Sequence, residues 1–88
     1  MTIKDKAIEQ ERIAFNNTNP LEADFEALCT GIVLRSTAAV HVAFDEPANT
    51  GSFLLPADVA IDIQPFKFTR VSALGNAGSG TLYILGRR

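Results

Sequence analysis

Apolar and polar side chains alternate in short runs from about residue 25 onward, which is the pattern of half-buried β-strands. The clearest run places Val59, Ile61 and Ile63 on one face, with small or polar residues between them. The predicted strands cover residues 25–35, 40–44, 52–55, 59–63, 66–74 and 81–85. Gly31 is predicted to form a bulge in the first strand or to allow a close approach of the backbone, and a shift of the apolar positions predicts another bulge near Thr69.

Turn-forming residues separate these strands. Asp45–Gly51 is a loop by composition, and Gly75–Gly80 is a glycine-rich turn. The strands recur roughly every 8–12 residues, which is typical of a β-sandwich or a barrel. Because no helical segment separates the strands, we expect them to pair in antiparallel fashion. The sequence therefore predicts an all-β, antiparallel β-sandwich, with a jelly-roll order and other Greek-key orders both open.

The first 20 residues differ in character from the rest of the chain. Lys, Glu, Gln, Ala and Arg dominate residues 2–15, and these residue types favour a helix. The apolar positions of this segment do not form one stripe, so an isolated helix here would be marginal in water. Two structures are therefore considered for residues 1–20: a short helix packed on the domain, and an extended arm that orders against a partner. Residues 21–88 are assigned to the sandwich.

The size and charge of the chain restrict its function. With 88 residues, of which 47% are apolar and 20% charged, the chain suits one packed domain. A net charge of −2 with scattered basic residues argues against binding to nucleic acid or to an anionic membrane. No apolar stretch approaches the roughly 20 residues of a membrane helix, and the first residues lack a secretory signal. We therefore expect the protein to be made and kept in a cytosol, unless it leaves inside or on a particle.

Cysteine and histidine occur once each, as Cys29 and His41, so neither an intrachain disulfide nor a His/Cys zinc cluster can form. Asp45 and Glu46 follow His41 closely enough to suggest a metal or acid–base site, and Cys29 could be a nucleophile paired with His41. No local signature supports either idea. His41, opposite the apolar face of its strand, is predicted to be solvated or to face a subunit, and Cys29 to be a small hydrophobe. We therefore expect no enzyme, no cofactor and no metal ligand.

The glycine-rich segment Gly75–Gly80 resembles a phosphate-binding loop in composition alone. Such loops lead into a helix whose first N–H groups contact the anion, whereas this segment leads into the strand predicted at 81–85. A hairpin turn is therefore predicted. Asn16–Thr18 matches the pattern of a glycosylation acceptor, but it is interpreted as a linker because nothing marks the chain as secreted.

Acidic and aromatic residues form two further candidate sets. Three alternating acidic residues could line a calcium site, although they lack the dense oxygen-ligand spacing of known loops, and a solvated strand face is predicted. These are Glu22, Asp24 and Glu26. Four aromatic residues could form a platform for a sugar, namely Phe53, Phe66, Phe68 and Tyr83. Because the chain has no tryptophan, we expect no such platform and place the three phenylalanines in the core.

Three phrases of strand and turn residues carry a resemblance to a known group. Val40–Phe44 reads Val-His-Val-Ala-Phe, Leu54–Ala57 reads Leu-Leu-Pro-Ala, and the last strand opens with Gly80–Leu82. Together with their neighbours, these phrases resemble small β-sandwich virion proteins of tailed bacteriophages. The resemblance covers roughly residues 31–85 and does not extend to residues 1–24.

The resemblance implies a structural role in the virion. It implies a cement or decoration protein that stabilises the capsid shell by binding major capsid subunits or other virion proteins, and that forms a dimer or trimer. No catalytic residue and no individual contact residue carries over. A tail, neck or fibre component is an alternative, as is a receptor- or glycan-binding module that uses the Asp45–Gly51 loop. An enzyme of a small β-fold type would need convergent polar residues, of which the sequence offers few.

Overall fold

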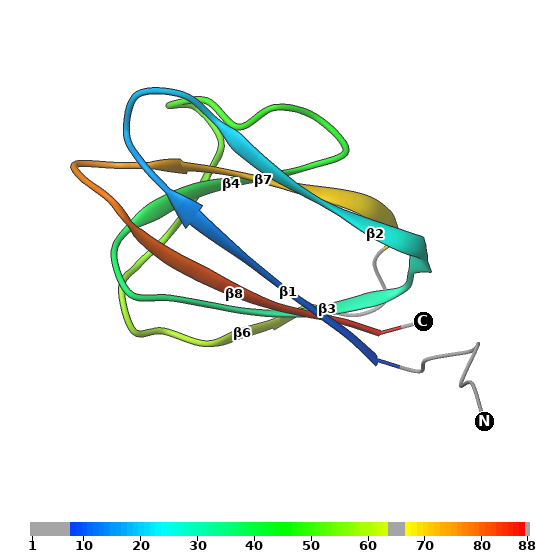
Figure 1. The fold of residues 1–88 in the computed structure, drawn as a ribbon. Helices are drawn as coiled ribbons and strands as arrows, with labels where there is room; N and C mark the ends of the chain where they lie inside the picture. The colour runs from blue at the N-terminus through cyan, green and yellow to red at the C-terminus, as the bar shows by residue number, and fades with distance from the viewer. Residues whose placement is uncertain (1–7, 64–66, 88) are drawn as a thin grey trace.

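A computed structural model describes residues 8–63 and 67–87 of the chain, and within these ranges the regular structure consists of strands. The strands are β1 (Ile8–Phe15), β2 (Leu21–Cys29), β3 (Gly31–Ser36), β4 (Val40–Phe44), β5 (Phe53–Leu55), β6 (Ile61–Ile63), β7 (Phe68–Gly75) and β8 (Gly80–Arg87). They form two four-stranded antiparallel sheets that pack face to face (Figure 1). The predicted all-β, antiparallel sandwich is therefore confirmed.

Sheet A has the strand order β1-β8-β3-β6, and sheet B has the order β2-β7-β4-β5. β4 and β5 are consecutive strands that pair with each other, whereas every other connection between consecutive strands crosses from one sheet to the other. β1 and β2, the first strands of the two orders, are in contact across the sandwich. The three-residue strands β5 and β6 therefore form the opposite flank, where each sheet ends.

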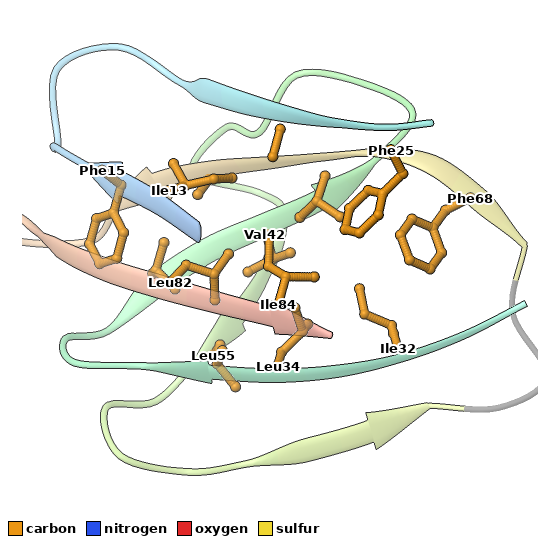
Figure 2. Packing of buried hydrophobic residues seen from close by; sticks show 14 of the residues in the cluster. Ile13, Phe15, Phe25, Ile32, Leu34, Val42, Leu55, Phe68, Leu82 and Ile84 are labelled. Carbon is orange, nitrogen blue, oxygen red and sulfur yellow. The ribbon is translucent and has the colours of Figure 1, made fainter. Parts of the chain in front are cut away.

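The core lies between the two sheets and receives alternate side chains from their strands (Figure 2). In β8, for example, Leu82 and Ile84 are buried, while Tyr83 between them is exposed. Phe15 lies toward one end of the core, and Phe25 packs edge to face on Phe68 toward the other, with ring centroids 5.2 Å apart. Burial of each large apolar side chain contributes about 1.5–3 kcal/mol, and this term holds the two sheets together.

The N-terminal segment departs from the expected helix. Residues 8–15 form β1, which pairs with β8 along its whole length, so the helix prediction is wrong for these residues. Ile13 and Phe15 point inward with the period of a strand, and a complete partner strand outweighs the weak helix propensity of the charged residues before them. Residues 8–15 thus lie within sheet A and do not extend away from the sandwich. Residues 1–7 lie outside the described ranges.

Three local predictions also need correction. The strand predicted over 25–35 is two strands in different sheets, and of the two alternatives for Gly31 the bulge is wrong, because Gly31 opens β3 in regular register with Arg87. Gly75–Gly80 does not form a hairpin, because β7 and β8 lie in different sheets and the intervening loop crosses one end of the sandwich. Irregular pairing is present opposite Thr69, where β2 shifts register between Asp24 and Cys29. The alternation predicted over 59–63 shortens to β6, and Phe66 is outside the described residues.

Asn16 closes the turn between β1 and β2. Its Oδ1 accepts hydrogen bonds from the backbone N–H groups of Thr18 and Asn19, each at 2.9 Å. This turn lets the chain leave sheet A and enter sheet B, as expected of a linker at Asn16–Thr18.

Candidate functional site

An aromatic side chain between two arginines marks the outer face of sheet A. Tyr83 on β8 pairs with Arg12 on β1 and with Arg35 on β3, so the three residues lie side by side across the sheet. We call them the Arg–Tyr–Arg row. Their side chains point away from the core, because Leu82 and Ile84 on either side of Tyr83 are buried. Tyr83 is 44% exposed.

This row borders an open hollow of about 680 Å³. The next row on the same face contributes Gln10, Leu85 and Val33, which pair across the same three strands. The hollow therefore combines apolar side chains with two arginines, and Glu11 also lines it. The Cα atoms of the two arginines are two interstrand spacings apart, which is roughly 10 Å.

The charges around the hollow leave the arginines accessible. Arg35 Nη2 lies 3.6 Å from Asp58 Oδ1, and both side chains are more than half exposed. Exposed ion pairs of this kind contribute little to stability and exchange readily with solvent. Arg87 is also exposed on β8, two residues beyond Leu85 on the same side of the strand.

A second surface lies on the edge of sheet B. Phe53, Leu54 and Val59 are 53%, 43% and 44% exposed, and we call them the β5 flank. Phe53 and Leu54 belong to β5, whose other edge carries no partner strand in the described sheet. The prediction that Phe53 lies in the core is therefore wrong. Phe53 pairs with the buried Val42 on β4, but sheet B ends at β5 and no further strand of the described residues covers the ring of Phe53.

His41 is buried, not solvated, so that prediction is wrong as well. The loop between β4 and β5 folds back over the outer face of sheet B, where Ala48 packs with Ala43 and Leu74. Its backbone covers the imidazole, whose Nδ1 lies 3.1 Å from the carbonyl oxygen of Ser52. Since a carbonyl oxygen only accepts, Nδ1 carries the proton in this contact.

The other imidazole nitrogen contacts a second loop. His41 Nε2 lies 3.1 Å from the side-chain oxygen Oδ1 of Asn76, which follows β7. The imidazole thus joins the β4–β5 loop to the loop that leads into β8. Each nitrogen lies within hydrogen-bond distance of a loop oxygen, so the imidazole bridges the two loops.

Asp45 anchors the start of the same loop. Its backbone adopts a left-handed conformation with φ of 59°, which aspartate tolerates better than most residues. Its Oδ1 accepts hydrogen bonds from the backbone N–H groups of Thr69 and Arg70, both at 3.0 Å, and from the Thr69 hydroxyl at 3.2 Å. These contacts, the Thr69 N–H above all, lower the pKa of Asp45. The Asp45 carboxylate, considered above as part of a site with His41, therefore binds Thr69 and Arg70 instead.

Cys29 and His41 do not form a pair. Their partners on β7 are Phe68 and Leu74, which are six residues apart, so the two residues are separated by roughly 20 Å along the sheet. Cys29 lies in the core, as predicted for a small hydrophobe. His41 faces the opposite side of sheet B.

The alternating acidic residues of β2 pair with Arg70. Arg70 Nε lies 2.7 Å from Asp24 Oδ1 and 3.8 Å from Glu22 Oε1, and the hydrogen bond to Asp24 is the main reason why the pKa of Arg70 is raised. Both carboxylates are exposed, which confirms the solvated strand face for these two. The side chain of Glu26 is outside the described part. Among described residues, no group of three potential metal ligands lies together.

No local signal in the sequence pointed to the Arg–Tyr–Arg row. Its members come from three strands, and they meet only because β8 lies between β1 and β3. Tyr83 was identified as a candidate for a sugar platform, but its neighbours were not. Phe68, from the same predicted set, is fully buried as expected.

The chain matches no protein-family model, no curated protein and no solved structure. Over residues 8–63 and 67–87 there is no helix with the length and hydropathy to cross a membrane. Function therefore has to be inferred from the chain's own surfaces and from the phrases of its sequence.

Proposed function

We propose that this chain is a non-catalytic structural protein of a phage particle, a decoration protein that binds major capsid subunits and stabilises the shell. The observation that carries the proposal is the β5 flank. Phe53, Leu54 and Val59 are each more than 40% exposed at or beside a sheet edge, and exposed apolar side chains at an unpaired edge support a contact with another protein.

The connectivity of the sandwich is compatible with this role. Eight strands in two sheets with the orders β1-β8-β3-β6 and β2-β7-β4-β5 form two Greek keys, and we infer that the domain is a jelly roll. Domains of viral capsids are among those with this architecture. Because one architecture serves many functions, the connectivity supports the proposal only together with the β5 flank and the virion-like phrases.

The area that a specific interface needs is a small share of the surface of this chain. A specific interface buries about 800 Å² on each partner, which for this chain is about 15% of its accessible surface of 5287 Å². The flank supplies the apolar centre of such an interface, and the polar residues of the β4–β5 loop would lie at its rim. The free edge of β5 adds backbone groups that a capsid strand or loop can pair with.

Binding to shells assembled without this protein tests the proposal. The purified chain is mixed with shells of the phage that encodes it, and bound protein is measured after sedimentation. We expect saturable binding, and we expect the double variant Phe53→Ser with Leu54→Ser to bind at least about tenfold more weakly, since each buried side chain of this size contributes about 1.5–3 kcal/mol.

A matched control uses another exposed leucine. Leu21 is 38% exposed at the start of β2, away from the flank, so Leu21→Ser should bind as the original chain does. All variants should retain their melting temperature within a few degrees because the changed side chains are exposed. Failure of the original chain to bind shells, or equal binding by both variants, would overturn the proposal.

A further inference from the structure

Tyr83 lies at the centre of sheet A and not at its edge. β8 is hydrogen-bonded to β1 on one side and to β3 on the other, so the backbone groups around Tyr83 are already paired. A ligand on this face therefore has to be recognised by side chains. Addition of a peptide strand, which needs unpaired backbone groups, is not possible here.

The apolar part of the face suits a small ring. The exposed face of Tyr83 and the neighbouring Leu85, which is 37% exposed, offer an apolar surface with a phenolic hydroxyl at its margin. A pyranose has C–H groups on its faces and hydroxyl groups around its edge, so it can stack on an aromatic ring while its edge forms hydrogen bonds. The hollow of about 680 Å³ has the size of a small-molecule site.

The two arginines of the row favour a ligand that carries a negative charge. Arg12 and Arg35 flank the ring of Tyr83, and each guanidinium can bind a carboxylate through two parallel hydrogen bonds. The same hollow is lined by Glu11, and Asp62 lies beside Val33, so the two arginines are the groups that can attract an anion here. A ligand can replace Asp58 as the ion-pair partner of Arg35 at little cost, because that pair is exposed.

We propose that the Arg–Tyr–Arg row binds a carboxylated sugar, with the pyranose ring stacked on Tyr83 and the carboxylate held by Arg12 and Arg35. A nucleic acid fits less well, since a polyanion needs a longer basic track than two arginines provide. The row lies on the face of sheet A, whereas Phe53 and Leu54 of the β5 flank lie on sheet B. The inference is therefore independent of binding to a capsid.

The test uses a disaccharide that contains glucuronic acid, and the neutral glucose disaccharide of the same linkage. Binding to the full chain is measured by calorimetry and by amide chemical shifts. We expect the acidic disaccharide to bind at least tenfold more tightly, with the largest shifts at residues 10–12, 33–35 and 83–85. Tyr83→Ala should weaken binding of both sugars at least tenfold. Arg12→Gln with Arg35→Gln should abolish the preference for the acidic one.

Two variants separate this site from other surfaces. Arg70→Gln removes an exposed arginine on sheet B and should leave sugar binding unchanged, and so should Phe53→Ser. Asp58→Asn, which keeps a residue that tolerates φ of 59°, should strengthen binding because it frees Arg35. No preference for the acidic sugar, or an affinity that Tyr83→Ala does not change, would overturn the inference. Tighter binding of an acidic peptide or an oligonucleotide to the same row would also overturn it.

Discussion

Gly75 and Gly78 lie in the same crossing between the sheets, yet an added methyl group would meet very different surroundings. At Gly75, a Cβ atom would collide with the carbonyl oxygen of Gly78 and would lie 3.1 Å from the carbonyl carbon and oxygen of Asn16. At Gly78, no atom lies within 4 Å of the added carbon. Neither glycine has a positive φ, so the two sites differ in space and not in backbone strain.

The size of the effect follows from these contacts. The obstacles at Gly75 are backbone atoms, which cannot rotate away as a flexible side chain can, and Gly75 also donates a hydrogen bond to the Asn16 carbonyl at 2.7 Å. Overpacking of this kind costs about 1–3 kcal/mol. For a domain of this size, each kcal/mol lowers the melting temperature by about 4–8 °C. Gly78→Ala should be neutral or should stabilise by up to about 1 kcal/mol, because it restricts the unfolded chain.

Thermal and urea unfolding of Gly75→Ala and Gly78→Ala, followed by circular dichroism, measures both effects. We expect the Gly75→Ala variant to melt at least about 4 °C lower than the original chain, and Gly78→Ala to melt at the same temperature or higher. Equal melting temperatures for the two variants, or a larger loss for Gly78→Ala, would refute the close packing of the β7–β8 crossing against the β1–β2 turn.

Three further substitutions test the β4–β5 loop. Hydrogen bonds from Thr69 lower the pKa of Asp45, so the Asp45 carboxylate stabilises the fold at a pH above the ordinary pKa of 3.8. That stabilisation is lost as the pH falls below 3.8 and the carboxylate is protonated. The difference in melting temperature between the original chain and Asp45→Asn should therefore shrink between pH 5 and pH 2.5. Ser72→Ala removes the buried acceptor of the Ala48 N–H, at 2.9 Å, and should cost about 1–3 kcal/mol in urea unfolding and speed hydrogen exchange at Ala48. His41→Leu leaves the carbonyl that Nδ1 contacts without a donor and should cost about 1–3 kcal/mol, while a cost below 0.5 kcal/mol would contradict the joining role of the imidazole.

The fold class could be predicted because alternation reports which side chains face the core. Val40 and Val42 in β4, and Leu82 and Ile84 in β8, are buried as their spacing indicated. The connections could not be predicted in the same way. The Gly75–Gly80 segment has the composition of a hairpin turn. Because β8 pairs with β1 and β3, however, this segment connects β7 in sheet B to β8 in sheet A.

The failures at single residues have a common physical cause, which is that contacts between distant segments decide burial. His41 reads as the outward residue of its strand and does point away from the core, yet the β4–β5 loop covers it. Phe53 reads as a core residue, yet it lies where sheet B ends. Arg12, in a segment with helix propensity, becomes a neighbour of Tyr83 only through the pairing of β1 with β8. None of these outcomes has a local signal.

The number of copies of this protein in the particle tests the central proposal most directly. On the proposal that a phage encodes the chain, virions of that phage are purified, and the protein is counted against the major shell protein by quantitative mass spectrometry. A decoration protein that binds capsid subunits predicts a copy number comparable to that of the shell protein. A copy number far below that of the shell protein, or absence of the chain from the particle, would contradict the proposal.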